Sequence, residues 1–185
     1  MLDIQLKEHT RLRHAILEKK LLRRVTEVQN VDDYQLLLSI LYGFYGAIES
    51  SVQQWFVDDR QHDFDQRRKA WRILEDIKDL GGKAQVPDLC KSLPVVNGYH
   101  AALGVMYVIE GSTLGGPIIA RLIQSRLNVD RGMSFFCAYG PESGTMWAAF
   151  KRILDEPYSD SERRNIVNGA QETFSKFDDW LSIHD

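Results

Sequence analysis

The feature that most constrains this chain is an apolar, helix-like stretch interrupted by four glycines and a proline: Gly104, Gly111, Gly115, Gly116 and Pro117. Glycine inside a helix costs about 1 kcal/mol relative to alanine. The spacing of the first three glycines places them on one helix face. Pro117 removes a backbone N–H and clashes with the carbonyl four residues earlier, which predicts a kink. A bent helix with a bare face lets either another helix or a planar ligand approach its backbone.

The other periodic segments also have helical spacing, and no alternation typical of strands persists for more than a few residues. Helices are expected at 2–22, 31–57, 65–80, 98–127, 144–155 and 159–183. Asn30 is a predicted N-cap of the second helix, and Ser159 or Asp160, helped by Glu162, of the last. Residues 83–97 and 128–142 are expected to form loops. These patterns predict an all-α helical bundle in a single domain over residues 1–185.

Charge and composition narrow the class of protein. The net charge is −3, from 23 basic and 26 acidic residues, which argues against a nucleic-acid or membrane-surface partner. Glu110 and Arg121 interrupt the most apolar run, 101–123, so no membrane span is expected. The N-terminal residues do not form a secretory signal, and Cys90 and Cys137 are too few for a disulfide framework. A cytoplasmic location is therefore expected.

The histidine spacing excludes two common helical metal sites. The sequence contains no Glu-x-x-His, the ligand pattern of ferritin-like di-iron proteins, and no His-Glu-x-x-His, the pattern of many zinc proteases. A single histidine ligand to the iron of a haem stays possible, because the porphyrin supplies the other ligands.

His14 is the best candidate for such a ligand. Glu18 follows one turn later on the same face and can accept from the imidazole N–H, which orients the ring. Lys7 lies two turns earlier, about 10 Å away along the axis, a distance that suits an ammonium near a propionate while His14 meets the iron. Arg11 is a second candidate for that contact. The alternative is that this pattern is an ordinary solvated helix face; His9 is interpreted as a surface residue.

Four segments, in order along most of the chain, resemble the haem oxygenase family. They are Leu6–His14 with Glu18 after it, Leu41–Glu49, Tyr107–Gly116, and Tyr139 through Trp147 and Phe150. The third reads Tyr-Val-Ile-Glu-Gly-Ser-Thr-Leu-Gly-Gly, the form found in the bacterial branch beside bacterial phytochromes. Each segment alone is a weak signal, but the four in register are a strong one.

The resemblance implies the haem oxygenase fold, with a kinked glycine-rich helix on the distal side of the haem. It implies that His14 is the axial iron ligand and Glu18 its partner. The backbone of Gly111 and Gly115, with Gly116 in the same motif, would lie against the distal haem face. Lys7, with Arg11 as the second candidate, would pair with a propionate.

The resemblance also implies a reaction. The family opens haem at a meso carbon with O2, giving biliverdin, ferrous iron and carbon monoxide, so that haem is both substrate and cofactor. Because the sequence has no flavin or nicotinamide motif, an external reductase or ferredoxin is implied as electron donor. A biliverdin-binding phytochrome is a possible acceptor of the product.

Two departures from the animal-type pattern leave alternatives open. Ser112 stands where those members have an aspartate that anchors a water network, although a serine hydroxyl can also hold a water. In the late helix that supplies propionate contacts, Lys151 is followed one turn later by Asp155. These departures favour, as the alternative, a non-catalytic haem carrier of the same fold. A third hypothesis is a haem-free relative of the thiaminase type, with Cys137 as nucleophile.

Overall fold

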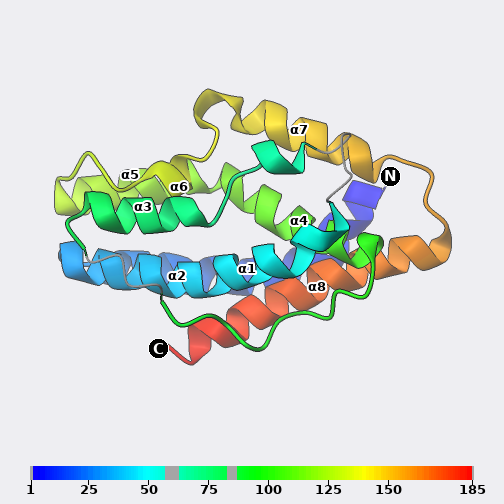
Figure 1. The fold of residues 1–185 in the computed structure, drawn as a ribbon, viewed down its shortest axis with the longest axis horizontal. Helices are drawn as coiled ribbons and strands as arrows, with labels where there is room; N and C mark the ends of the chain where they lie inside the picture. Colours follow the sequence, from blue (N-terminus) through cyan, green and yellow to red (C-terminus); the bar gives the residue numbers. More distant parts are fainter. Residues whose placement is uncertain (1, 57–62, 83–86, 185) are drawn as a thin grey trace.

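The computed structural model describes residues 2–56, 63–82 and 87–184, and this part of the chain is helical with no strand (Figure 1). The predicted all-α architecture is confirmed. The α-helices are α1 (Leu2–Glu27), α2 (Val31–Val52), α3 (Trp71–Asp79), α4 (Tyr99–Gly111), α5 (Gly116–Leu127), α6 (Ser134–Cys137), α7 (Ser143–Leu154) and α8 (Asp160–Ser182). Short 3-10 turns are η1 (Gln53–Trp55), η2 (Phe64–Gln66), η3 (Ser112–Leu114) and η4 (Gly140–Glu142).

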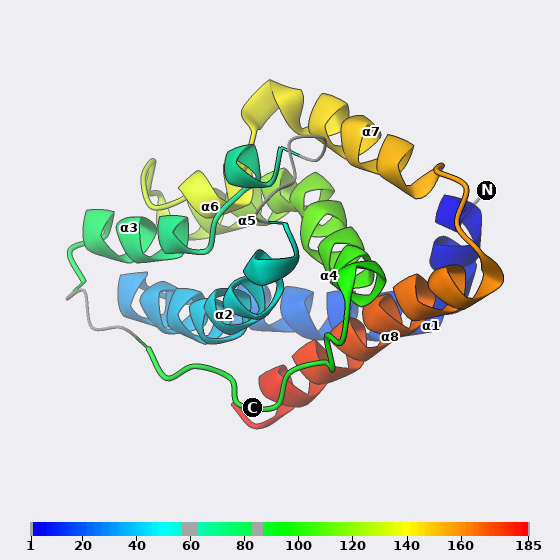
Figure 2. The same cartoon turned by 45° about the vertical axis from the view of Figure 1, so that its right-hand side comes forward.

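Helix α8 is the main packing partner of both α4 and α1, as Figure 2 shows from a turned view. Glycines on both helices let α4 and α8 approach closely: a Cβ added to Gly104 would meet the carbonyl of Ile166, and one added to Gly169 would meet the carbonyl of Ala101. On the other side of the molecule α3 packs against α2 and α6. The segment after α3 crosses α2 and α8, where the amide of Cys90 donates to the carbonyl of Gly43.

The predicted kink in the glycine-rich stretch is confirmed, but the expectation of one helix over 98–127 is wrong. Helix α4 ends at Gly111, a 3-10 turn follows, and α5 begins at Gly116 at an angle of 44°. The hydroxyls of Ser112 and Thr113 bond to carbonyls three residues back, which tightens this turn. Pro117 lies in the first turn of α5, where a missing N–H costs no hydrogen bond. Within the described residues no single helix is long and apolar enough to cross a membrane; only this bent pair reaches the required length and composition.

The expected helix over 65–80 is also wrong in its first half. Residues 64–66 form a 3-10 turn, and α3 begins only at Trp71. The backbone amide of Arg68 donates to the Tyr139 phenol at 2.6 Å, and that of Ala70 donates to the Glu49 carboxylate at 2.6 Å. Because side chains from elsewhere bind these amides, the segment does not need helical hydrogen bonds.

The remaining boundaries differ by smaller amounts. Helix α1 continues five residues past the predicted end at 22 because Val25 is fully buried and extends the apolar face. Helix α2 ends at Val52 and passes into a 3-10 turn, while residue 57, the predicted end, lies outside the described residues. The expected loop over 128–142 contains α6 and η4. The N-caps at Asn30 and Ser159, with Glu162 completing a capping box, are confirmed.

Candidate functional site

His14 presents a free imidazole nitrogen on the surface of α1. Its side chain is 60% exposed, and Nδ1 lies 3.6 Å from a carboxylate oxygen of Glu18, one turn later. The ring meets the edge of Phe174 from α8 at a centroid distance of 5.6 Å. With Nδ1 facing Glu18, Nε2 has no protein partner within the described ranges. This is the arrangement in which a carboxylate orients a histidine for a metal ligand at its other nitrogen.

A contact between α1 and α4 places His14 near the glycine-rich turn. Thr10 on α1 is buried, its hydroxyl donates to the Leu6 carbonyl at 2.7 Å, and its side chain lies beside the phenol of Tyr107 on α4. Both helices run from the end of the molecule that carries the N-terminus toward the other end (Figure 1). His14 lies one turn beyond Thr10, and Gly111 lies one turn beyond Tyr107. The free imidazole and the break in the glycine-rich helix therefore lie in the same region.

The glycines of the bent stretch fall into two groups: Gly104 and Gly116 pack closely against other backbone, whereas Gly111 and Gly115 do not. Gly104 packs against α8, and a Cβ on Gly116 would collide with the carbonyl of Phe136. Close protein packing thus accounts for glycine at both positions. At Gly111 an added Cβ would make only ordinary contact, 3.6 Å from the Trp147 ring, and at Gly115 its nearest neighbour would be the carbonyl oxygen of Ser112 at 3.9 Å.

The side chain of Ser112 points into a polar network beneath the break. Its hydroxyl donates to the carbonyl of Ile109 at 2.7 Å and accepts from Arg68 Nη2 at 2.7 Å and from the Tyr45 phenol at 3.2 Å. A hydroxyl has one proton and two lone pairs, so these three bonds use its full capacity. In this arrangement the Ser112 hydroxyl is bonded to protein groups.

A buried ion pair lies next to this network. Arg67 and Glu110 have side chains that are only 3% and 1% exposed, and they bond at 2.9 Å. Arg67 also donates to the carbonyl of Met146 on α7, and the Tyr139 phenol donates to Glu110 at 3.0 Å. Burial and the nearby Glu110 charge raise the pKa of Tyr139 well above its usual value. The phenol is therefore a permanent hydrogen-bond donor to Glu110.

A small cavity of about 10 Å³ lies between the network and the protein surface, with room for about one water. Tyr45, Glu49, Arg68 and Lys69 are among the residues that line it. Burial raises the pKa of Glu49 and lowers that of Lys69, and each charge partly offsets the effect at the other.

Apolar side chains are exposed beside the break, at Leu114 (45%) and Ile118 (58%). The apolar residues exposed on α1, Leu12 (73%) and Ile16 (47%), are each two residues from His14 and therefore lie on a different face of that helix. Helices α1 and α5 are in contact. Lys7 and Arg11 are exposed on α1 as well. A free imidazole nitrogen, a bare backbone, exposed apolar side chains and two basic residues together fit a large, flat, acidic, iron-containing ring such as haem.

The other histidines do not join this region. His9 lies on the surface, where Nδ1 bonds to the carbonyl of Gln5, as expected. His100 lies 3.4 Å from Glu162, a pairing that the sequence pattern did not reveal, and His184 bonds to the carbonyl of Trp180. His62 lies outside the described residues.

The sequence pattern did not identify Arg68 as a site residue, and it did not separate Tyr45 from the core. A signal was available, because Arg67 and Arg68 are adjacent basic residues in a stretch that also contributes to the core. Glu110, a carboxylate inside an apolar run, was a second signal that a buried cation lies nearby.

The fold and this site define an all-helical protein with a histidine-bearing first helix near a broken glycine-rich helix. Residues 1–182 match the family model described as "Heme oxygenase". The chain belongs to the haem oxygenase family and is an enzyme of that family.

Relatives and solved structures agree with this assignment. Over 152 residues the chain is 28% identical to a heme oxygenase of Xanthomonas campestris pv. campestris (strain 8004), covering 80% of this chain and 88% of the relative. The fold matches the NO- and CO-bound heme oxygenase from Neisseria meningitidis with a TM-score of 0.83 and 20% identity, over 99% of this chain and 91% of the other. It matches the heme oxygenase from Leptospira interrogans with a TM-score of 0.79 and 19% identity, over 98% of both chains.

Proposed function

We propose that this enzyme opens haem at a meso carbon, giving biliverdin, ferrous iron and carbon monoxide from O2 and externally supplied electrons. The observation that carries the proposal is the exposed His14 imidazole, whose Nδ1 faces Glu18 while Nε2 has no protein partner among the described residues. Bound haem would supply the iron that activates dioxygen and would itself be the substrate. We propose the cytoplasm as the location, a reductase or ferredoxin as electron donor, and a biliverdin-binding phytochrome as a possible acceptor.

In this proposal His14 binds the iron through Nε2. At 3.6 Å the Glu18 carboxylate attracts Nδ1–H electrostatically, which favours the tautomer with the lone pair on Nε2 and makes Nε2 a better donor to the metal. Phe174 limits rotation of the ring from the α8 side. A neutral imidazole gives little electron push toward O–O cleavage, in contrast to a thiolate ligand.

On the opposite face, Gly111 and Gly115 present main chain in place of side chains. An added Cβ would make only ordinary contacts, with the Trp147 ring 3.6 Å away at Gly111 and the Ser112 carbonyl 3.9 Å away at Gly115, so packing against the rest of the protein does not require glycine at either position. A close backbone leaves room for dioxygen and shields most of the ring edge, which selects the carbon that is oxidised. The Trp147 ring borders this space beside Gly111.

Lys7 and Arg11 are the proposed propionate contacts. Both are exposed on the helix that carries His14, at two turns and about one turn before it. Ammonium and guanidinium groups pair well with carboxylates. Their removal should weaken haem binding without removing the iron ligand.

A haem carrier is the second candidate, and one observation favours it. The Ser112 hydroxyl is fully engaged with protein groups, so it does not offer a donor toward the open side of the turn. A thiol nucleophile at Cys137 has no such support, because burial and Asp76 raise its pKa.

The test is a titration of the purified protein with hemin, followed by ascorbate in air. Loss of the Soret band with growth of a biliverdin-like red absorption supports the oxygenase, and chromatography of the pigment identifies the isomer. A Soret band that persists under ascorbate and under a ferredoxin–reductase system supports the carrier. If no Soret shift occurs at a stoichiometric ratio, the haem proposal is wrong.

The variant His14→Ala tests whether His14 is the iron ligand without being needed for folding. We expect it to fold like the wild type, because the side chain is exposed, but to lose the histidine-ligated spectrum and most ring opening. His9→Ala is the matched control, since His9 is an exposed histidine on the same helix whose ring bonds to the Gln5 carbonyl one turn earlier. Equal spectra and turnover in wild type and H14A would overturn the assignment of the ligand.

A further inference from the structure

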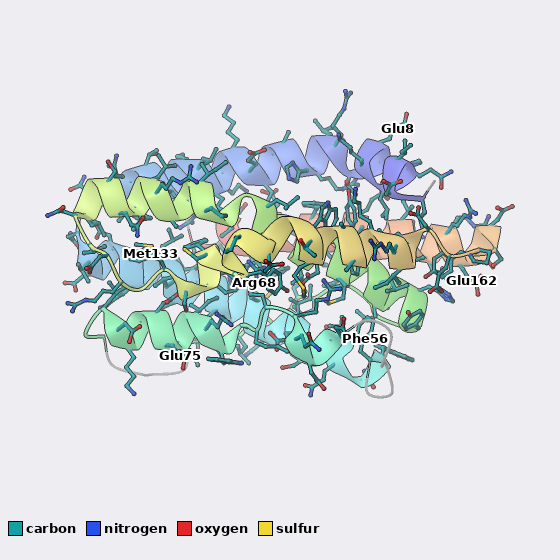
Figure 3. All side chains as sticks on the ribbon, turned by 90° about the horizontal axis from the view of Figure 1, so that it is seen from above. Glu8, Phe56, Arg68, Glu75, Met133 and Glu162 are labelled. Atoms are coloured by element: carbon teal, nitrogen blue, oxygen red, sulfur yellow. The ribbon has the colours of Figure 1, made fainter. Side chains whose placement is uncertain are left out.

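Arg68 joins two segments that are far apart in the sequence. It comes from the stretch between η2 and α3, yet its guanidinium bonds to the end of α4: Nη2 donates to the Ile109 carbonyl at 3.0 Å and to Ser112 Oγ at 2.7 Å. Its side chain is buried, and in Figure 3 it lies in the middle of the molecule, whereas Glu8 and Glu75 lie near opposite edges. The two acceptors flank Gly111, the last residue of α4.

The position of Arg68 is itself fixed by the surrounding protein. Its backbone N–H donates to the Tyr139 phenol at 2.6 Å, and its guanidinium lies over the ring of Phe135 at 4.1 Å and near that of Tyr45 at 5.1 Å. A planar guanidinium stacked on aromatic rings is well ordered, and it presents its donors in a fixed direction. The bonds to α4 are therefore made from a rigid base.

The acceptors of Arg68 lie at the C-terminal end of α4, where backbone carbonyls lack partners within the helix. The last carbonyls of a helix lack internal partners, and Ile109 is among the last residues of α4. Ser112 begins the 3-10 turn that separates the two helices, and both its lone pairs are used by Arg68 and Tyr45. Because Gly111 and Gly115 have no side chains that could pack and hold the turn in place, the hydrogen bonds from Arg68 restrain its backbone instead.

We infer that Arg68 is a positioning residue for haem opening: acting through Ser112 and the Ile109 carbonyl, it holds the Gly111–Gly115 backbone at the place from which that backbone selects the oxidised carbon. This inference rests on the proposed function. Arg68 acts from beneath the turn, on the side occupied by Ser112 and Ile109, and it does not need to touch the ring.

The experiment compares Arg68→Met, Arg68→Lys, Ser112→Ala and the double variant R68M/S112A with the wild type. Arg72→Met is the control, because Arg72 is a partly buried arginine on α3 whose guanidinium contacts the Trp71 ring, 5.8 Å away, and bonds to neither Ile109 nor Ser112. Three properties are measured: hydrogen exchange of the peptides that cover 106–118 in the haem-free protein, the ratio of biliverdin isomers, and the hemin Kd.

In R68M the amides of the turn should exchange about tenfold faster or more, because two buried hydrogen bonds are lost there. The biliverdin should become a mixture of isomers while the hemin Kd changes less than about threefold, since His14 and the basic residues of α1 are untouched. S112A should change the exchange rate and the isomer ratio in the same direction as R68M but by less. R68M/S112A should change them no more than R68M does. R68K should restore part of the selectivity, because an ammonium reaches only one acceptor at a time.

Two results would overturn the inference. One is R68M with wild-type exchange over 106–118 and an unchanged isomer ratio. The other is effects of R68M and S112A that add fully in the double variant, because the two residues would then act separately. If R68M does not fold, R68K and S112A still decide the matter. A wild type that binds hemin but makes no biliverdin defeats the proposed function instead, and the exchange data then report on the turn alone.

Discussion

The main chain of Gly104 in α4 lies against the carbonyl of Ile166 in α8. A Cβ on Gly104 would overlap the Ile166 oxygen and would lie 2.7 Å from the amide nitrogen of Ala170. The relationship is reciprocal one turn away, where Gly169 of α8 faces the carbonyl of Ala101 in α4. These two glycines let the helices touch through their backbones, and this close crossing supports the helix that carries Gly111.

Gly104→Ala should therefore destabilise the protein, despite the higher helix propensity of alanine. The methyl group meets backbone atoms that cannot rotate away, and such overpacking costs about 1–3 kcal/mol, or more when helices must separate. Gly115→Ala is the matched control: its Cβ has ordinary space, so it should be neutral or stabilising by up to about 1 kcal/mol. Urea unfolding of both variants measures the difference. Equal midpoints for G104A and the wild type would contradict the tight crossing.

The buried pair of Arg67 and Glu110 gives a second prediction about stability. Arg67→Met should cost about 3–5 kcal/mol, because it leaves a fully buried carboxylate whose remaining hydrogen-bond partner among the described residues is the Tyr139 phenol. The variant R67M/E110L should be more stable than R67M alone, since the uncompensated charge is removed. Denaturant unfolding at neutral pH measures both. A double variant that is less stable than R67M would show that the pair contributes more than charge compensation.

Patterns with a local cause predicted much of the fold. The apolar periodicity of α2, its Asn30 cap and the capping box at Ser159 all depend on neighbours within one turn, and the structure contains each of them. The kink followed from glycine and proline chemistry at 111–117. What the sequence could not show is that the end of α4 is bonded to Arg68, because Arg68 is more than forty residues away from Ser112.

The candidate site likewise contains some pairings that local sequence spacing predicts and others that only tertiary packing creates. His14 and Glu18 are one turn apart on a helix, so their pairing could be read from spacing, and they lie 3.6 Å apart. The pairing of Arg67 with Glu110 and of Tyr139 with Arg68 is set by tertiary packing between residues that no local rule connects. For the same reason, Gly116 could be grouped with Gly111 and Gly115 in the sequence although its backbone packs against Phe136.

Glu49 predicts a pH dependence of stability. Burial raises its folded-state pKa above the ordinary value, although the Ala70 amide and the Lys69 and Arg68 charges partly offset this. Between the unfolded and the folded pKa, the folded protein binds more protons, so this group lowers the free energy of unfolding as pH rises through that window. Glu49→Gln keeps an acceptor for Ala70 but cannot ionise. The stability of E49Q minus that of the wild type should therefore grow from pH 4 to pH 7 in urea unfolding, and a flat difference would contradict the raised pKa.

Ala138 provides the last prediction, because its backbone has a conformation that only glycine adopts easily. Its φ of 43° and ψ of −104° lie outside the regions allowed to L-residues. The next residue is Tyr139, whose phenol bonds to both Glu110 and the Arg68 amide, so the surrounding contacts hold the strained residue in place. Such strain costs about 1–3 kcal/mol, while glycine loses about 0.5–1 kcal/mol more backbone entropy on folding. Ala138→Gly should therefore stabilise the protein by about 1 kcal/mol in thermal or urea unfolding.

Asn128→Gly is the control, because Asn128 has ordinary left-handed helical angles of 51° and 44° that asparagine tolerates, and it should change stability by much less. If A138G is instead less stable than the wild type, the conformation of Ala138 is not strained, and the placement of Tyr139 depends on the alanine methyl group.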